Sequence, residues 1–406
     1  MRLESRALRG SKRVNKKVPL GITVSLVAVA AAITFIITMT FSLDIYNAMV
    51  TGVKEREEIY EKLEEIDVYV RNNFNGEIDE DYLHDSIADG YINGLNDKYS
   101  AYYNAQEHSN EDLSNQGQLI GIGVTITKEE SGYIKIVKVD EASPAKEAGI
   151  VEGDIIVKVD GSDVLVTGYE QSVTNIKGNE GSKVVVTIRR EGEDKNFELT
   201  RKKMEIKSVT GRMIENIGYV RISTFNSSTV EQFKAMVNKH QVDGAKGLIF
   251  DVRDNGGGTV SSVEEMLDFL LPEGTLATVT YKDGLTKVLR TSDENFIDLP
   301  MTIIVNNNTA SAAELFAATI RDFNKGKLVG VTTYGKGVMQ NTYTLKDGSA
   351  IKFTVGYYFP PKSANYDGVG LKPDYEIALE GDFAAIEEQN DTQLQKAIEV
   401  LKTSIK

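Results

Sequence analysis

The chain has 406 residues, a formal net charge of −14 and 41% hydrophobic residues. This length predicts two or three domains, and the absence of cysteine excludes disulfides, thiolate metal sites and a cysteine nucleophile. The first 17 residues hold seven basic side chains and one acidic side chain, so the remaining 389 residues carry −20. So acidic a body argues against a nucleic-acid partner.

Residues 18–43 form a stretch of 26 residues without a charged side chain. A helix rises about 1.5 Å per residue, so this stretch spans the roughly 30 Å hydrocarbon core of a membrane. The basic segment 1–17 predicts a cytoplasmic N-terminus and an extracytoplasmic body. We expect a single-pass signal anchor in the cell membrane. A cleaved signal peptide is the alternative, but the stretch is long for one and no clear small-x-small site follows it.

Residues 44–116 are charged and helical in pattern. Between Ile59 and Val70, apolar residues recur every three or four positions. A second helix is expected from Tyr82 to Leu95, followed by the segment Lys98–Tyr103. Simple amphipathic packing is one explanation of these helices.

Residues 117–204 are predicted to form strands separated by glycine turns. A glycine-rich loop enters a strand at Leu119–Ile126, and a short helix with Pro near its start covers Ser143–Ile150. This series resembles a PDZ domain, which adds an extended peptide to a sheet edge and holds its carboxylate with loop N–H groups. The residues that match this loop are Gly121, Ile122, Gly123 and Val124.

Strands and helices alternate over residues 205–380, which predicts an α/β core. Strands are expected at Ile217–Phe225 and Gly247–Arg253, with a helix at Thr229–His240 between them. A glycine loop, Asp254–Gly258, follows the second strand and allows backbone N–H groups to approach a ligand. An ordinary strand-to-helix turn is the alternative.

The expected fold is therefore a multidomain α+β and α/β protein. It combines a transmembrane helix, a helical region, a mostly β PDZ domain, an α/β core and a helical tail over 381–406. Within that tail, an amphipathic helix is expected from Asp391 to Ser404.

Ser311 is the candidate nucleophile. The apolar run Met301–Val305 predicts a buried strand, and three asparagines then form a turn. An alanine-rich helix is expected over Thr309–Ala318, capped by Thr309 or Ser311. A serine at this turn lies beside unpaired backbone N–H groups that can stabilise an oxyanion. The alternative role of Ser311 is that of a plain helix cap.

A serine nucleophile needs a base. Two of the three histidines, His84 and His108, lie in a polar region, and His240 is expected at an exposed helix end. Lys336 instead lies between two glycines and next to predicted strands. Burial has to lower its pKa by roughly three units for it to act as a base near neutral pH. Gln340, expected on the same strand face, is a candidate to hold the amine.

Two other roles are open to Lys336, that of an exposed turn lysine and that of a phosphate-loop lysine. The spacing Gly330-x4-Gly335-Lys336 comes close to a phosphate loop, but Gly337 stands where Ser or Thr must hold magnesium. A strand rather than a helix is also expected at Thr342–Leu345. No nucleotide, other cofactor or metal is therefore expected.

Two motifs, Thr309–Glu314 and Tyr334–Gln340, occur in an order and separation that resemble the carboxy-terminal processing peptidases, or tail-specific proteases. These are serine peptidases with a Ser–Lys dyad and a PDZ domain. The resemblance implies that Ser311 is the nucleophile, Lys336 the base and Gln340 a supporting residue. It also implies an oxyanion hole made by the N–H of Ala312 and that of Gly257 or Gly258.

The family resemblance also bears on partners. It implies that the helices of residues 44–116 help to pair two subunits. Many relatives carry Arg before the glycine after the second PDZ helix. Here Lys177 precedes Gly178, which keeps the charge of a coupling residue but not its bidentate geometry.

The function expected from the sequence is that of a membrane-anchored extracytoplasmic serine endopeptidase. It processes or degrades proteins engaged through their C-terminal peptide. A catalytically silent PDZ scaffold is the alternative, and a histidine triad has no placed histidine to support it.

Overall fold

The structure is a computed structural model, and it describes residues 19–381, 383 and 386–405. The predicted cytoplasmic segment 1–17 lies outside the described residues. The chain divides into two units, one up to Glu80 and one from Asp81 onward, and each is described separately.

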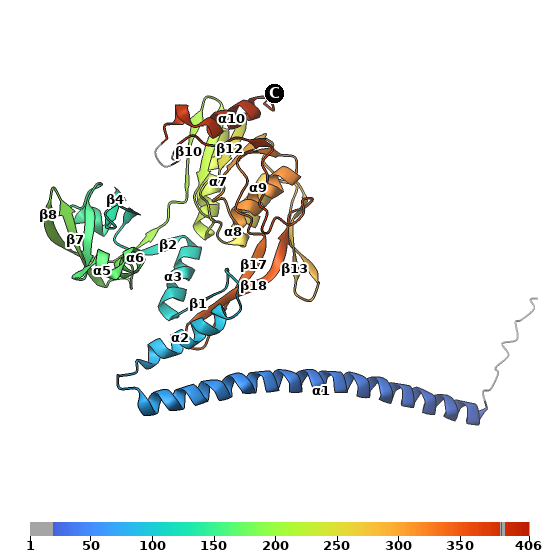
Figure 1. Cartoon of the computed structure of the whole chain (residues 1–406). Coiled ribbons are helices and arrows are strands. Elements are labelled where there is room, and N and C mark those ends of the chain that lie inside the picture. The colour runs from blue at the N-terminus through green and yellow to red at the C-terminus, as the bar shows by residue number, and fades with distance from the viewer. Residues whose placement is uncertain (1–18, 382, 384–385, 406) are drawn as a thin grey trace, which may run out of the picture. The chain divides into compact units, whose positions relative to one another are not determined.

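The first unit contains one long helix, α1 (Leu20–Asn73; Figure 1). Its segment Leu20–Ser42 is, within the described residues, the one helix long and apolar enough to cross a membrane. Near the end of α1, Arg71 pairs with Asp67 at 2.8 Å and with Glu80 at 2.6 Å. These exposed pairs hold the chain where it leaves the helix.

The second unit begins with helices α2 (Glu80–Asn93) and α3 (Ala105–Gln116). Between them, β1 (Ala101–Tyr103) pairs antiparallel with β18 (Ala350–Phe359). Strand β18 also pairs with β13 (Gly274–Tyr281) and β17 (Val338–Thr344), and β13 pairs with β14 (Thr286–Ser292). A segment from the start of this unit is therefore part of a sheet formed by its end.

The PDZ domain contains a six-stranded sheet and a separate two-stranded ribbon of β2 (Gln118–Gly121) and β9 (Lys202–Glu205). The sheet runs in the order β3 (Val124–Lys128), β4 (Ile134–Val139), β5 (Ile155–Val159), β7 (Lys183–Arg190) and β8 (Glu193–Thr200), and β6 (Ser162–Asp163) pairs with β5. The helices are α4 (Pro144–Glu147), α5 (Val164–Thr167) and α6 (Tyr169–Ile176). Alternate strand residues such as Ile134, Ile136 and Ile188 are buried in its core.

The largest sheet of the core has six strands, and all its pairs are parallel except that between its first two strands. Its order is β10 (Val209–Ile214), β11 (Ile217–Ile222), β12 (Gly247–Asp251), β15 (Met301–Val305), β16 (Gly326–Gly330) and β19 (Tyr375–Glu376). Strands β12 and β15 are buried along their whole length. Continuous apolar runs are typical of strands covered on both faces.

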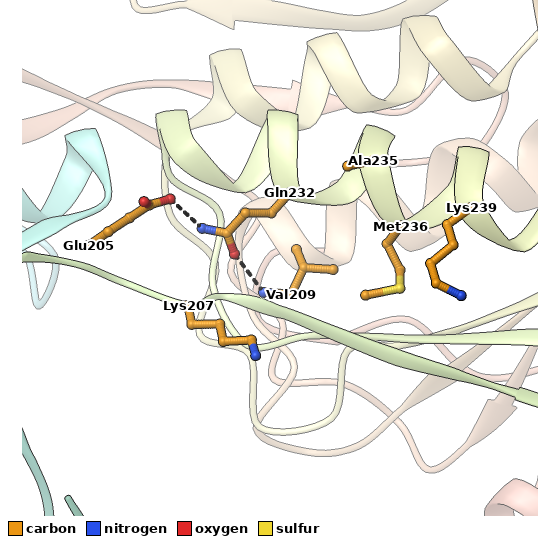
Figure 2. A pocket seen from close by; sticks show the side chains of 7 residues that line it. All are labelled: Glu205, Lys207, Val209, Gln232, Ala235, Met236 and Lys239. Atoms are coloured by element: carbon orange, nitrogen blue, oxygen red, sulfur yellow. Dashed lines mark hydrogen bonds between the residues drawn. The ribbon is translucent and has the colours of Figure 1, made fainter. Parts of the chain in front are cut away.

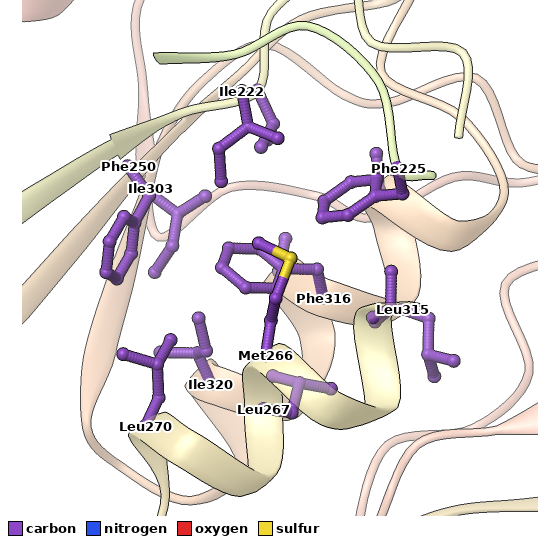
Figure 3. Close-up of a cluster of buried hydrophobic side chains, with 14 of the residues drawn as sticks. Ile222, Phe225, Phe250, Met266, Leu267, Leu270, Ile303, Leu315, Phe316 and Ile320 are labelled. Carbon is purple, nitrogen blue, oxygen red and sulfur yellow. The ribbon is translucent and has the colours of Figure 1, made fainter. Parts of the chain in front are cut away.

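Helices cover both faces of this sheet. Side chains such as Phe250 and Ile303 pack against α7 (Ser227–Val242), α8 (Val260–Leu270) and α9 (Ala312–Asp322). Figure 3 shows this cluster around Phe316, whose ring lies 5.5 Å from that of Phe225. The alternate residues Ile249 and Ile304 face α10 (Thr392–Lys402) instead.

One expectation from the sequence is wrong. His240 does not lie at an exposed helix end, because only 1% of its surface is exposed. Its ring packs against Gly218, and its Nε2 lies 3.2 Å from the carbonyl oxygen of Tyr219. Helix α7 turns this residue toward β11, a tertiary contact that its polar sequence neighbours did not indicate.

Candidate active site

The candidate site is formed by three loops that follow neighbouring parallel strands. The glycine loop follows β12, the segment Asn306–Ser311 follows β15, and the lysine loop Val331–Gly337 follows β16. The carboxyl ends of adjacent parallel strands lie at one edge of a sheet, where ligands usually bind in α/β folds. Sheet topology therefore brings Ser311, Lys336 and the glycine loop to one edge.

Ser311 is the residue before the first turn of α9 and is 8% exposed. Its backbone has φ 57° and ψ −120°, a conformation that costs about 1–3 kcal/mol for a residue other than glycine. The helix begins at Ala312, and Ser311, one of the two caps predicted from the sequence, is its N-cap residue. Among the described residues, the N–H of Ala312 has no acceptor.

The glycine loop lies directly against the serine. A Cβ atom on Gly257 would stand 3.0 Å from Cβ of Ser311 and 3.1 Å from the nitrogen of Ala312. Any side chain at position 257 would crowd Ser311. The N–H of Gly257 donates to Oδ1 of Asn255 at 2.8 Å, whereas that of Gly258 has no acceptor within the part of the chain that is described.

Asn255 connects the glycine loop to the serine loop, a role that the sequence analysis missed. Its side chain is fully buried and donates to the carbonyl oxygen of Ile222 at 3.0 Å. The backbone carbonyl oxygen of Asn255 accepts from the N–H of Ala310 at 2.9 Å. An asparagine in a glycine-rich turn gives no sequence signal that separates this role from that of an ordinary turn residue.

Glu314 joins the serine loop to the lysine loop. Its Oε2 accepts from the N–H of Ser311 at 2.9 Å and from that of Lys336 at 2.8 Å. Its Oε1 accepts from the N–H of Gly335 at 2.8 Å and from the hydroxyl of Thr333. Burial raises the pKa of Glu314, and the four hydrogen bonds oppose that shift. The sequence analysis included Glu314 in a motif but gave it no role.

Thr309 adds a second link between the same loops. Its hydroxyl donates to the carbonyl oxygen of Val252 at 2.8 Å, and its carbonyl oxygen accepts from the N–H of Tyr334 at 3.0 Å. Thr309 is fully buried, so these bonds are shielded from water. The backbone of the lysine loop is therefore attached to the serine loop at two points.

The lysine itself lies in a loop and not on a strand, since β17 begins only at Val338. Gly335 has φ 85°, and a Cβ there would stand 2.7 Å from the nitrogen of Gly370. At Gly337 a Cβ would meet the side chain of Asn365 at 2.7 Å. Close approach of neighbouring backbone therefore explains both glycines that flank Lys336.

Burial lowers the pKa of Lys336, and the positive charges of Lys352 and Lys98 lower it further, whereas Asp97 opposes them. This is the direction that a general base requires. Among the described residues, no hydrogen bond or ion pair involves its ammonium, so none joins it to the Ser311 hydroxyl. The Nζ atom lies 4.5 Å from the centre of the Tyr99 ring.

Two buried tyrosines lie next to the serine. The hydroxyl of Tyr366 donates to the carbonyl oxygen of Ser311 at 3.5 Å. Burial raises the pKa of Tyr358 well above its usual value, and the neighbouring Ser311 hydroxyl opposes the shift. Both phenols therefore stay protonated near neutral pH and are available as donors.

Gln340 lies on β17, close to the lysine loop. Its amide donates to the carbonyl oxygen of Val338 at 3.3 Å and to Oγ1 of Thr354 at 3.2 Å. No hydrogen bond joins it to Lys336 within the described residues.

The predicted peptide-binding residues of the PDZ domain line one groove between β3 and α6. Gly121, Ile122, Gly123, Val124 and Lys177 all contribute to it, together with apolar side chains of α6. Lys177 is exposed at the end of α6. Its ammonium is therefore accessible to a ligand in the groove.

A buried arginine holds the end of α6 from behind. Arg201 donates to the carbonyl oxygens of Ile176 at 3.0 Å and Asn175 at 2.7 Å. A Cβ at Gly178 would meet the Arg201 side chain at 2.9 Å. Arg201 therefore positions the helix end that carries Lys177.

A second groove contains none of the predicted site residues. It runs between α7 and the strands β9 and β10, and Figure 2 shows its lining residues. Gln232 closes one end, because its amide contacts both Glu205 at 3.1 Å and the N–H of Val209 at 3.1 Å. No group of three or more metal-binding side chains is found in the residues that the structure covers.

Comparison with known proteins agrees with this architecture. Residues 216–377 match the model of peptidase family S41, and residues 120–200 match that of the PDZ domain. A CtpA-like serine protease of Staphylococcus haemolyticus is 33% identical over 329 residues, which is 80% of this chain and 66% of that protein. One from Staphylococcus aureus strain MSSA476 is 30% identical over 349 residues, 85% of this chain and 70% of that protein.

A solved S41 protease from Bacteroides fragilis shares the fold, with 17% identity and a TM-score of 0.52 over 78% of this chain and 90% of that one. The fold and its three-loop edge thus define a class, a family S41 peptidase core that carries a PDZ domain. Within this class, the chain belongs to the CtpA-like serine proteases. It spans about two thirds of the length of the Staphylococcus haemolyticus relative.

Proposed function

We propose that this protein is a serine endopeptidase with a Ser311–Lys336 dyad. The observation that carries the proposal is the Glu314 carboxylate, which accepts hydrogen bonds from the N–H groups of both residues. Two loops joined in this way hold a nucleophile and a base of lowered pKa close to each other.

The reaction begins when the neutral amine of Lys336 takes the proton of the Ser311 hydroxyl. The serine oxygen attacks the substrate carbonyl carbon, and the negative charge on the carbonyl oxygen is stabilised by the N–H of Ala312 and that of Gly258. Lys336 then returns the proton to the leaving amine as the peptide bond breaks. The neutral lysine then takes a proton from a water molecule, whose oxygen attacks the acyl carbon. As the bond to Ser311 breaks, Lys336 gives this proton to the serine oxygen, and the acid product leaves.

Two rearrangements accompany this mechanism. The Lys336 ammonium leaves the Tyr99 ring and approaches the Ser311 hydroxyl, so the described conformation corresponds to a resting state. Gln340 moves together with Lys336 and supports the amine in its new position.

The N–H of Gly257 already donates to Asn255, and for this reason we assign the second oxyanion donor to Gly258.

We further propose that the PDZ groove binds the C-terminal peptide of a protein substrate. Its loop of Gly121–Val124 provides N–H groups for the carboxylate, and Lys177 adds a positive charge that couples binding to the core. The apolar part of α1 anchors the protein in the cell membrane with its body on the extracytoplasmic side. Two copies are proposed to pair through residues 44–116.

The main alternative is a PDZ protein whose core binds peptides without cleaving them. Labelling the full-length protein with a fluorophosphonate probe separates the two functions. The dyad predicts rapid labelling that is lost in Ser311→Ala and reduced about a hundredfold or more in Lys336→Ala. Equal labelling of the Lys336→Ala variant would contradict the dyad.

The substrates are found by mass spectrometry of protein C-termini in cells that produce Ser311→Ala. Proteins that keep additional C-terminal residues only in the variant are candidate substrates. A C-terminal proteome identical to that of wild-type cells would favour the binding protein.

A further inference from the structure

The segment Asp97–Ser100 contacts the catalytic lysine, although it precedes the PDZ domain in the chain. Its Tyr99 ring centre lies 4.5 Å from Nζ of Lys336. An ammonium at this distance from a ring face is attracted by the electrons of the ring. Tyr99 is therefore part of the wall of the active site, a position that its local sequence does not indicate.

The Tyr99 ring is held by the turn that carries it. The Asp97 carboxylate accepts from the N–H of Tyr99 at 3.2 Å and from the hydroxyl of Ser100 at 2.7 Å. Strand β1 starts at the next residue and pairs with β18, with Ala101 opposite Lys352. The ring is thus fixed to the same strand that carries Thr354, the acceptor for the Gln340 amide.

An aromatic face suits a lysine that must act as a base. A carboxylate in contact would keep the amine charged, because an adjacent opposite charge raises the pKa of lysine. A ring attracts the ammonium more weakly and takes none of its protons in a conventional hydrogen bond. The ring therefore holds the side chain beside the site without a hydrogen bond that must be broken before the amine moves to the serine.

Other charged and titratable groups surround the Lys336 amine. From β18, Lys352 faces it, itself paired with Glu111 at 3.1 Å and bonded to the hydroxyl of Tyr103 at 3.1 Å. From the turn come Asp97 and Lys98, and Lys98 lies 4.7 Å from the Tyr99 ring and 5.3 Å from that of Tyr334. Burial raises the pKa of Tyr99, and the negative charge of Asp367, which lies in the loop after β18, raises it further.

We propose that Tyr99 is a positioning residue for Lys336: its ring face holds the amine at the edge of the site. This inference rests on the proposed function, in which Lys336 is the base. It gives the segment before the PDZ domain a role in the chemistry of the core.

The test is the rate at which a fluorophosphonate probe labels the full-length protein in detergent, measured across pH. In Tyr99→Leu the amine loses its support, and we expect labelling to slow by about tenfold to a hundredfold. Loss of the ring also removes a contact that favours the charged amine. The pH at which labelling is half-maximal should therefore move downward, a change that a structural defect alone would not produce.

Two variants serve as matched controls. Tyr99→Phe keeps the ring face and should restore both the rate and the pH profile. Tyr102→Leu removes a tyrosine of the same segment whose hydroxyl bonds to Asp85, and its pH profile should match the wild type. Pentafluorophenylalanine at position 99 keeps the shape but reverses the charge of the ring face, so it should move the profile in the same direction as Tyr99→Leu even if the leucine variant folds poorly.

An unchanged rate and pH profile in both the leucine and the pentafluorophenylalanine variants would overturn the proposal. Faster labelling of Tyr99→Leu would also overturn it, since the ring would then restrain the amine. Failure of the dyad is a separate outcome, because it appears as normal labelling of Lys336→Ala whatever stands at position 99.

Discussion

At the scale of single residues, the site depends on side chains that do no chemistry themselves. Glu314 is fully buried, and its carboxylate accepts four hydrogen bonds: two from the backbone of the lysine loop, one from Thr333 and one from the N–H of Ser311. Buried carboxylates are costly unless they are satisfied in this way. Of the two links between the lysine loop and the serine loop, the one that reaches Ser311 and Lys336 themselves therefore depends on this side chain.

Replacing Glu314 with Gln tests this dependence. An amide group has one acceptor oxygen and one NH2 group, so about two of the four donors would face another donor. Each stranded donor costs roughly 1–3 kcal/mol. We expect a lower Tm by calorimetry and fluorophosphonate labelling slowed at least tenfold.

The matched control is Glu231→Gln, which changes a glutamate side chain that is 82% exposed. It should leave Tm and labelling at wild-type values. Wild-type behaviour of the Glu314 variant itself would mean that the two loops are held without its carboxylate.

The pH dependence of the reaction is also decided by single residues. The charge of Lys352 lowers the pKa of Lys336, after burial, which is the larger cause. Lys352→Met removes that charge, so the pKa of Lys336 should rise and a smaller fraction of the amine should be neutral at a given pH. Since the base acts in its neutral form, the acid limb of the pH–rate profile should move to higher pH.

Labelling rates measured across pH would check this, with Lys346→Met as the control at an exposed position. A limb that stays in place, or moves to lower pH, would contradict the assignment of Lys336 as the titrating group.

At the scale of elements, the turn from β15 to α9 combines a functional side chain with a strained backbone. Ser311 is buried and has a positive φ that glycine adopts without strain. Its hydroxyl is needed for the proposed chemistry, so the strain is retained at the site. Strain of this kind is common where a side chain must point into an active site.

Two inactive variants can measure the strain. Ser311→Ala keeps a Cβ in the unfavourable conformation, whereas Ser311→Gly removes it. We expect Ser311→Gly to be the more stable of the two by about 1–2 kcal/mol in chemical unfolding. Equal stability, or greater stability of the alanine variant, would show that the turn carries no strain.

At the scale of the whole molecule, a buried ion network closes the core sheet. Arg253 is 1% exposed and pairs with Asp251, the last residue of β12, and with Asp391 at 2.7 Å. Asp391 also caps α10 by accepting from the N–H of Leu394 at 2.9 Å. The Asp391 carboxylate thus caps α10, the helix that covers the second face of the sheet. Through Arg253 it also attaches α10 to the end of β12, which leads into the glycine loop.

Asp391→Ala should therefore destabilise the core strongly. It leaves a buried arginine partly unpaired, which costs about 3–5 kcal/mol, and removes a helix cap. The measurement is thermal unfolding of the full chain. Asp298→Ala is the control, because this carboxylate is 86% exposed in its pair with Lys325 and such pairs contribute at most about 1 kcal/mol. Similar Tm values for the two variants would show that α10 is held by its apolar contacts alone.

Local patterns in the sequence were sufficient for much of the fold. The bounds of β15 agree with the apolar run Met301–Val305, and the alternation of strands and helices predicted the α/β core. The same patterns identified Ser311 and Lys336 as candidates, because a serine at a strand-to-helix turn and a lysine between glycines are visible over a few residues. Hydrophobic periodicity and turn chemistry act over such short distances.

Only the tertiary structure decided which groups surround these two residues. The ring of Tyr99, the carboxylate of Glu314 and the amide of Asn255 reach the site because sheet pairing brings distant loops to one edge. The burial of His240 has the same origin, since α7 packs it against β11. Contacts between residues far apart in the chain depend on the summed packing of whole elements, and no local pattern in the sequence carries that information.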